Sequence, residues 1–103
     1  MKPVRIRPTA REDMRREVRY HRREAGAAVA GKLADRLRRA LERLSLEPAL
    51  GSPRMGQLLD VAGLRTWPLD GFPMSLWYFE RVDHVDVARL VAHRQDGERI
   101  ELE

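Results

Sequence analysis

The sequence predicts an α+β fold with the element order β-α-α-β-β-β, in which a helical hairpin packs on a small antiparallel sheet. Two observations support this prediction. Residues 27–46 place apolar side chains at helical spacing, and residues 63–94 read as three consecutive strands separated by turn residues. Two helices joined by a short connection must bury their apolar stripe against another element, which the sheet provides. At 103 residues, the chain is expected to form a single domain over residues 1–103.

Short patterns mark the first strand and the start of the first helix. Val4 and Ile6 alternate with two arginines, which indicates a strand with one buried face. Thr9 and Glu12 have the spacing of a capping box, in which both side chains satisfy backbone N–H groups at a helix start. A helix is therefore expected from about Ala10.

A glycine separates the two predicted helices. Gly26 is expected to end the first helix, because glycine readily adopts the conformation that terminates helices. One face of the first helix holds a row formed by Ala10, Met14, Val18 and His21. The second helix is predicted over residues 27–46, with an apolar stripe formed by Ala30, Leu33, Leu37, Ala40, Leu41 and Leu44. Two i,i+4 pairs of opposite charge are expected on it, Asp35 with Arg39 and Arg38 with Glu42.

The second half of the chain is predicted to be a loop followed by strands. Residues 47–62 contain two prolines and two glycines, which are typical of a loop. Three strands are expected over residues 64–69, 72–82 and 85–93. Asp70-Gly71 is a strong signal for the first turn between them, since both positions tolerate positive φ. The last strand is apolar on both faces, as in strands that have neighbours and a helical cover. The polar residues from 96 onward are expected to fray or to add an edge strand.

The charge is divided unevenly along the chain. The net charge is +4, yet residues 1–43 hold 14 basic and 6 acidic side chains, whereas residues 44–103 hold 6 basic and 10 acidic ones. All but two of the 20 basic residues are arginines. A guanidinium group binds carboxylates and phosphates through paired hydrogen bonds. An acidic protein or a nucleic acid is therefore a candidate partner, and an ordinary solvated arginine-rich face is the alternative.

Several classes of function lack their sequence signals. The chain has no cysteine, so disulfides and thiolate chemistry are excluded and a cytoplasmic location is expected. No apolar run approaches the roughly 18 residues of a membrane helix, and no signal-peptide pattern is present. Phosphate-binding and metal-binding motifs are absent, so no cofactor and no metal are expected. Glu12 and Asp13 are placed on the solvated side of the first helix, where acid–base catalysis is not expected.

The remaining chemistry is cationic and lies at the predicted strand ends. Side chains at strand ends can reach a common edge of a sheet, where they would hold a phosphate or an acidic loop. The candidates for binding a target in this way are Arg65, Tyr78, Arg81, His93 and Arg94. Structural interpretations stay open beside this one. Arg65 could pair with Asp60 or Asp70, and of Trp77 and Tyr78 the one that faces inward would belong to the core.

Short segments in a fixed order also resemble a known family. They are Val4-Arg5-Ile6, Thr9-Ala10-Arg11-Glu12-Asp13-Met14, Tyr20, Arg36-Leu37 to Leu44, Leu46-Glu47-Pro48-Ala49-Leu50-Gly51, Gly63-Leu64-Arg65, Trp77-Tyr78 and Val91-Ala92-His93-Arg94-Gln95-Asp96. Together they resemble the RelE/ParE family of bacterial toxins, over nearly the whole chain. The ParE branch is the closer match, because no tyrosine follows Tyr78 and the sheet half is net negative, which disfavours RNA binding.

The resemblance implies a toxin of a type II toxin–antitoxin system that inhibits DNA gyrase, without bond-breaking chemistry of its own. It also implies a role in plasmid stabilisation and a ParD-like antitoxin, with which the toxin forms a heterotetramer or a larger complex. The disordered tail of such an antitoxin is expected to fold onto the helical hairpin as an acidic, apolar-studded segment. The candidates for ion pairs at the rim are Arg15, Arg19, Arg36, Arg39 and Arg43.

Two other functions remain as alternatives. The first is a RelE-like ribosome-dependent mRNA endoribonuclease, with Arg65, His93 and Arg94 around the scissile phosphate and the histidine as acid or base. The second is a small nucleic-acid-binding module that presents its basic hairpin.

Overall fold

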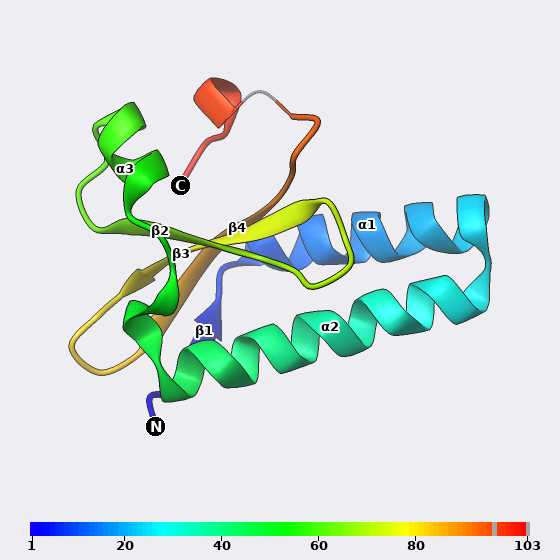
Figure 1. The fold of residues 1–103 in the computed structure, drawn as a ribbon, viewed down its shortest axis with the longest axis horizontal. Helices are drawn as coiled ribbons and strands as arrows, with labels where there is room; N and C mark the ends of the chain where they lie inside the picture. The colour runs from blue at the N-terminus through cyan, green and yellow to red at the C-terminus, as the bar shows by residue number, and fades with distance from the viewer. Residues whose placement is uncertain (96, 103) are drawn as a thin grey trace.

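The computed structural model describes residues 1–95 and 97–102, without the side chain of Glu98. Two long helices and one short helix pack on a four-stranded sheet, which confirms the α+β fold (Figure 1). The elements are β1 (Val4–Ile6), α1 (Pro8–Ala25), α2 (Ala27–Leu46), α3 (Arg54–Leu59), β2 (Leu64–Pro68), β3 (Met74–Glu80) and β4 (Val85–Ala92), with single 3-10 turns at Pro48–Leu50 and Gly97–Arg99. The α1–α2 hairpin crosses one face of the sheet and projects beyond it.

The sheet is mixed, with the strand order β1-β4-β3-β2. β2, β3 and β4 pair as antiparallel neighbours, as predicted. β1 pairs with β4 in parallel, with Val4 opposite Val85, so the expectation of a purely antiparallel sheet is wrong at this edge. The strands β1 and β4 are separated by the whole helical hairpin, and a connection of that length permits a parallel pairing that a tight turn would exclude.

The start of α1 differs from the capping-box prediction. The helix begins at Pro8, and Arg7 at the N-cap makes no side-chain hydrogen bond to the first turn. Proline fits this first position, because its fixed φ suits the helix and the missing N–H would have had no partner there. The Thr9 hydroxyl points to the sheet instead and donates to the backbone oxygen of Ala88 at 3.4 Å. The end of α1 is as predicted, since Gly26 follows it with φ at 94°.

α2 has the predicted bounds, whereas α3 was missed. α2 spans Ala27–Leu46, and its two predicted ion pairs are present, Arg39–Asp35 at 3.0 Å and Arg38–Glu42 at 3.3 Å. α3 lies inside the segment that was expected to be a loop. Six residues are too few to show a helical period, and this helix ends at Asp60 in the left-handed region, with φ at 55°.

The sheet has an apolar core on each face. The core between the hairpin and the sheet contains buried side chains from both, including Leu33, Leu37 and Leu44 of α2 and Met74, Leu76, Tyr78, Val85, Val87 and Leu90 of the sheet. The opposite face buries Leu64, Trp77, Phe79, Ala88 and Val91. Partly buried side chains from α3, the loop after it and the C-terminal segment cover this second face: Met55, Leu59, Val61, Ile100 and Leu102. Trp77 and Tyr78 are therefore both core residues, on opposite faces of β3.

Candidate partner-binding site

The buried face of α1 is rotated from the predicted one. Ala10, Asp13 and Glu17 face the sheet and are at most 2% exposed, whereas Met14 and Val18 are only partly buried. The solvated position predicted for Asp13 is therefore wrong. The rotation brings two carboxylates under the helix. Met14 and Val18 pack at the edge of the first core and also help to line a groove.

Asp13 joins α1 to β4. Its carboxylate accepts hydrogen bonds from Arg89 Nε at 2.7 Å, Arg89 Nη2 at 3.0 Å and the backbone N–H of Leu90 at 3.1 Å. The pairing of β1 with β4 ends at Val87, so beyond it the edge of β4 needs another acceptor. Asp13 supplies it, and its hydrogen bonds raise the pKa of Arg89 above the usual value.

A second ion-pair cluster surrounds Asp86. Arg7 donates to both carboxylate oxygens of Asp86 from Nε and Nη2, each at 2.9 Å. Arg81 donates to the same carboxylate at 2.9 Å and places its guanidinium 4.5 Å from the centre of the Phe79 ring. The hydrogen bond from Arg7, with the one from Arg81, lowers the pKa of Asp86 below its usual value. Arg81, a predicted target-binding residue, is therefore already paired with an acid of the same chain, while its side chain stays 44% exposed.

This lowered pKa gives a pH dependence of stability. The unfolded chain takes up the Asp86 proton near the usual pKa of about 3.9, whereas the folded chain does so only at lower pH. The stabilisation is therefore complete above about pH 4 and is lost as the pH falls through the folded pKa. Asp86→Asn should be less stable than the parent protein at pH 7 and should lose less stability between pH 5 and pH 2. Urea unfolding followed across this range tests the prediction. It would be contradicted if the two proteins lost the same free energy of unfolding between pH 5 and pH 2.

Arg65 and Tyr78 hold the turn after α2. Arg65 Nη1 donates to the backbone oxygens of Ala49 at 3.2 Å and Gly51 at 2.7 Å. The Tyr78 hydroxyl donates to the Pro48 oxygen at 2.6 Å and accepts from the Gly51 N–H at 2.8 Å. Burial raises the pKa of Tyr78, which keeps this hydroxyl protonated. Because Tyr78 is fully buried, it has no surface to offer to a target, and its predicted role as a contact residue is wrong for this structure.

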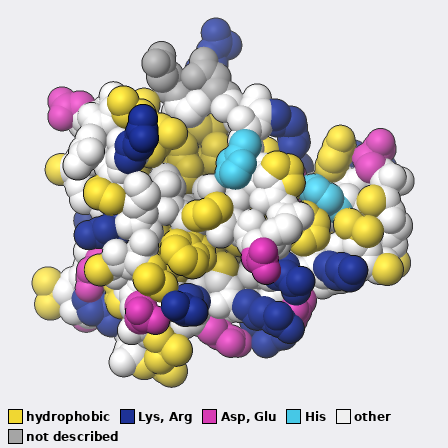
Figure 2. Space-filling model, in the orientation of Figure 1, with side chains coloured by type: hydrophobic (Ala, Val, Ile, Leu, Met, Phe, Trp, Pro, Cys, Tyr) yellow, Lys and Arg dark blue, Asp and Glu magenta, His cyan; other side chains and the backbone are white. Residues whose placement is uncertain are grey.

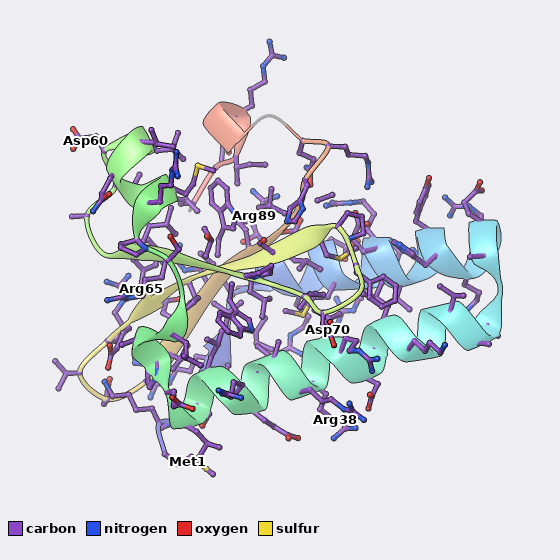
Figure 3. All side chains as sticks on the ribbon, viewed as in Figure 1. Met1, Arg38, Asp60, Arg65, Asp70 and Arg89 are labelled. Carbon is purple, nitrogen blue, oxygen red and sulfur yellow. The ribbon has the colours of Figure 1, made fainter. Side chains whose placement is uncertain are left out.

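The two alternative ion pairs of Arg65 are not formed. Its Nη1 donates to backbone oxygens, and Arg65 lies at the end of the sheet that is far from the β2–β3 turn (Figure 3). Asp70 sits on that turn, above α2, and approaches Arg36 with a separation of 3.8 Å. Asp60 is exposed at the end of α3.

The predicted cationic set does not meet at one edge. Arg65 and Arg81 lie where β2 starts and β3 ends, whereas His93 and Arg94 follow the far end of β4. Because adjacent strands run in opposite directions, consecutive strand ends alternate between the two ends of the sheet. The expectation of a common edge is therefore wrong.

His93 and Arg94 also diverge from each other. His93 Nε2 lies 2.8 Å from the Ser75 hydroxyl on the neighbouring strand. Arg94 reaches back to α1, where it lies 3.4 Å from a carboxylate oxygen of Glu17 and 5.3 Å from the centre of the Tyr20 ring. The other carboxylate oxygen of Glu17 is buried without a hydrogen-bond partner among the described residues. Neither side chain faces Arg65, so the three do not surround a common point.

The helical hairpin carries an open apolar groove. This hairpin groove, of about 600 Å³, is lined by Met1, Val4, Val18, Ala34, Leu37, Arg38, Leu41, Glu42, Ser45 and Leu46. Val18 also belongs to a shallower extension along α1, of about 390 Å³, lined by Arg11, Met14, Arg15, Val18 and Arg19. Met1 is 94% exposed and Leu46 is 60% exposed, so part of the apolar lining is open to solvent.

A second groove lies on the other side of α2. This arginine groove, of about 560 Å³, is lined by Arg36, Arg39, Ala40, Arg43, Trp67, Pro68, Leu69, Asp70 and Gly71. In Figure 2, basic side chains gather along α2 on this face. Its arginines already have acidic neighbours, because Arg39 pairs with Asp35 and Arg43 with Glu47. The five arginines predicted to contact an antitoxin therefore divide, with Arg15 and Arg19 at the hairpin groove and the other three here.

Comparison with known proteins identifies the family. Residues 4–100 match the family model of the ParE toxin of the type II toxin–antitoxin system parDE. The chain belongs to the ParE toxin family. A solved structure described as a chromosomal ParDE toxin–antitoxin system from P. aeruginosa has the same fold as this ParE-family chain, with a TM-score of 0.75 and 18% sequence identity. The alignment covers 89% of this chain and 96% of that one. No protein of curated function matches the sequence.

None of the helices in the described residues is long and apolar enough to cross a membrane. Within the same residues, no group of acidic, histidine or cysteine side chains is arranged to hold a metal ion.

The ion pairs that join the elements of this ParE-family chain were not found from the sequence. Arg7 and Arg89 bind acids that lie 79 and 76 positions away, and such pairs leave no local spacing to detect. A signal did exist for the buried carboxylates. Asp13 and Glu17 follow Ala10 at intervals of three and four, which places both acids on the face that the helix buries.

Proposed function

We propose that this toxin of a ParDE system inhibits DNA gyrase and is neutralised by a ParD-like antitoxin that occupies the hairpin groove. The observation that supports antitoxin binding there is the open apolar lining of the groove beside two arginines, Arg15 and Arg19, that share a single acid. A toxin–antitoxin heterotetramer or larger complex in the cytoplasm belongs to the same proposal.

The chemistry of the hairpin groove fits an amphipathic acidic segment. Met1, Val18 and Leu46 offer apolar surface in one groove, and an exposed apolar groove of this kind marks a site for another polypeptide. Burying each such side chain is worth about 1.5–3 kcal/mol before the costs of association are subtracted. Arg15 and Arg19 share one acid, Glu12, at 3.7 and 3.2 Å, so this pair of arginines keeps one positive charge for a partner carboxylate.

The geometry of the sheet favours gyrase inhibition over mRNA cleavage. The cleavage alternative requires Arg65, His93 and Arg94 around one phosphate, and these side chains lie at two ends of the sheet. Arg65 Nη1 is also occupied by two backbone oxygens. Family membership supports a toxin, and the separation of Arg65, His93 and Arg94 supports one that acts by binding.

Purified protein tests the target directly. We expect it to inhibit supercoiling of relaxed plasmid DNA by gyrase, and we expect the antitoxin encoded beside it to restore supercoiling. Transcripts on programmed ribosomes should stay intact at the same protein concentration. Cleaved transcripts together with unaffected supercoiling would overturn the gyrase assignment in favour of the endoribonuclease.

Charge reversal tests which groove receives the antitoxin. Arg15→Glu with Arg19→Glu should weaken antitoxin binding about tenfold or more and should flatten its dependence on salt, because each rim ion pair is worth roughly 0.2–1 kcal/mol and reversal adds repulsion. Arg39→Glu with Arg43→Glu changes the net charge equally but lies in the arginine groove, so its effect should stay within about threefold. Titration calorimetry at several salt concentrations measures both. Equal losses for the two double variants would contradict the assignment to the hairpin groove.

A further inference from the structure

The C-terminal segment lies on the face of the sheet that is opposite to the helical hairpin. Residues 100–102, named here the strap, run beside α3 in Figure 1. Ile100 and Leu102 are partly buried and pack against the second apolar core, which contains Trp77 and Phe79. Glu101 between them is exposed. The strap therefore covers apolar surface of the sheet with side chains two residues apart, as an extended segment does.

Two arginines bind the backbone of the strap. Arg89 Nη1 donates to the backbone oxygen of Glu101 at 2.8 Å, and Arg7 Nη1 donates to the backbone oxygen of Leu102. Figure 3 shows Arg89 between the sheet and the C-terminal segment. Hydrogen bonds to backbone oxygens do not depend on which side chains the segment carries. Any extended segment with a matching apolar pattern can make the same contacts.

The same two guanidinium groups are fixed independently of the strap. Arg7 uses Nε and Nη2 on the carboxylate of Asp86, and Arg89 uses Nε and Nη2 on the carboxylate of Asp13. Both carboxylates are at most 9% exposed as residues. Each arginine uses only Nη1 to bind the strap. Both Nη1 donors would therefore stay in position if the strap dissociated from the sheet.

We propose that the sheet face under the strap is a binding site for an extended acidic peptide segment of a partner protein, and that the strap occupies this site in its absence. The segment that fits has apolar side chains at alternate positions with an acid between them, as in Ile100-Glu101-Leu102. Arg7, Arg81 and Arg89 outnumber their two carboxylate partners, Asp86 and Asp13, by one, and this excess positive charge favours an acidic segment. The site lies across the sheet from the hairpin groove and does not depend on the assignments of antitoxin or gyrase.

Occupation by the strap makes the site closed by default. A tethered segment a few residues from its site acts at an effective concentration of the order of millimolar, which an external peptide must exceed. A short peptide should therefore bind poorly to the unaltered protein. Weakening the strap should open the site without altering the arginines that form it.

A strap variant of the full chain tests this proposal. In a Trp67→Phe background, Trp77 is the only tryptophan and reports on the covered face, because it is 3% exposed. Ile100→Ser with Leu102→Ser should shift its emission to the red. A peptide with the sequence of residues 97–103 should reverse this shift and should bind the variant at least tenfold more tightly than the unaltered chain. Leu58→Ser, at a 69% exposed leucine of α3 outside the second core, is the matched control and should behave as the parent.

Several outcomes would overturn the proposal. They are an unchanged Trp77 emission in the strap variant, equal peptide affinity for variant and parent, and no binding to either. A peptide with serine at both apolar positions should not bind. If the double variant does not fold, Leu102→Ser alone replaces it. Amide exchange of the unaltered chain gives a second readout, since Ile100 should exchange far faster than Val87 inside β4, and equal protection would show that the strap does not open.

Discussion

Asp13→Ala should lower the free energy of unfolding by about 3–5 kcal/mol, because it breaks a buried ion pair and leaves its cation uncompensated. Asp13 is 2% exposed and satisfies both Arg89 and the backbone N–H of Leu90. Without it, the α1 helix loses its polar link to β4. The Arg89 guanidinium loses its carboxylate partner, and the edge N–H of Leu90 loses its acceptor. Urea denaturation at pH 7 measures the loss.

Asp35→Ala is the matched control. Asp35 also sits on a helix among arginines, but its side chain is 30% exposed and its ion pairs face solvent. Solvent-exposed pairs contribute about 0–1 kcal/mol each, so this variant should lose little stability. If the two variants lost similar amounts, the buried link between α1 and β4 would not be the stabilising element described above.

Gly51→Ala should cost about 3 kcal/mol, at the upper end of what overpacking of a core usually costs. A Cβ atom at this position would collide with the Tyr78 hydroxyl oxygen and would lie 2.7 Å from the ring carbon Cε1 of Tyr78. The backbone itself tolerates alanine, since φ at Gly51 is −64°. The loss would come from displacing the buried tyrosine and breaking its hydrogen bonds to the turn after α2.

Gly31→Ala provides the opposite control for the same chemical change. Gly31 lies inside α2, and a Cβ atom added there would meet no side chain or other element within 4 Å. Alanine should therefore stabilise the helix by about 0.5–1 kcal/mol. Thermal unfolding should move in opposite directions for the two variants. If Gly51→Ala were as stable as the parent protein, the packing of the Tyr78 ring against Gly51 would have to be less tight than in this structure.

Local signals in the sequence were sufficient for the long elements. Gly26 and the apolar stripe of α2 are read from neighbouring residues, and both bounds of α2 agree with the structure. The parallel direction of β1 could not be predicted in this way, because Val4 of β1 pairs with Val85, 81 positions away, and no tight turn connects the two strands. α3 was not predicted, because six residues make fewer than two helical turns and show no helical period.

The candidate site was predicted less well than the fold, for a related reason. Arginines at strand ends are visible in the sequence, but the register that places Arg65 and His93 at different ends of the sheet is a property of the assembled strands. The roles of Arg65 and Tyr78 depend on Gly51, which comes close only after folding. Of the five arginines predicted for the rim of a hairpin groove, Arg15 and Arg19 lie beside the hairpin groove, whereas Arg36, Arg39 and Arg43 line the arginine groove. Helical spacing shows which residues share a face, but it does not show on which side of the hairpin a groove opens.

The dissociation constant of the antitoxin for Leu46→Asp tests the central claim most directly. Leu46 lines the hairpin groove and is 60% exposed, so a carboxylate there should leave the fold intact yet be buried without a partner in the complex. We predict a loss of affinity of at least about tenfold, while Leu58→Asp, at a similarly exposed leucine outside the groove, should bind as the parent does. Unchanged affinity of Leu46→Asp would contradict the placement of the antitoxin in this groove.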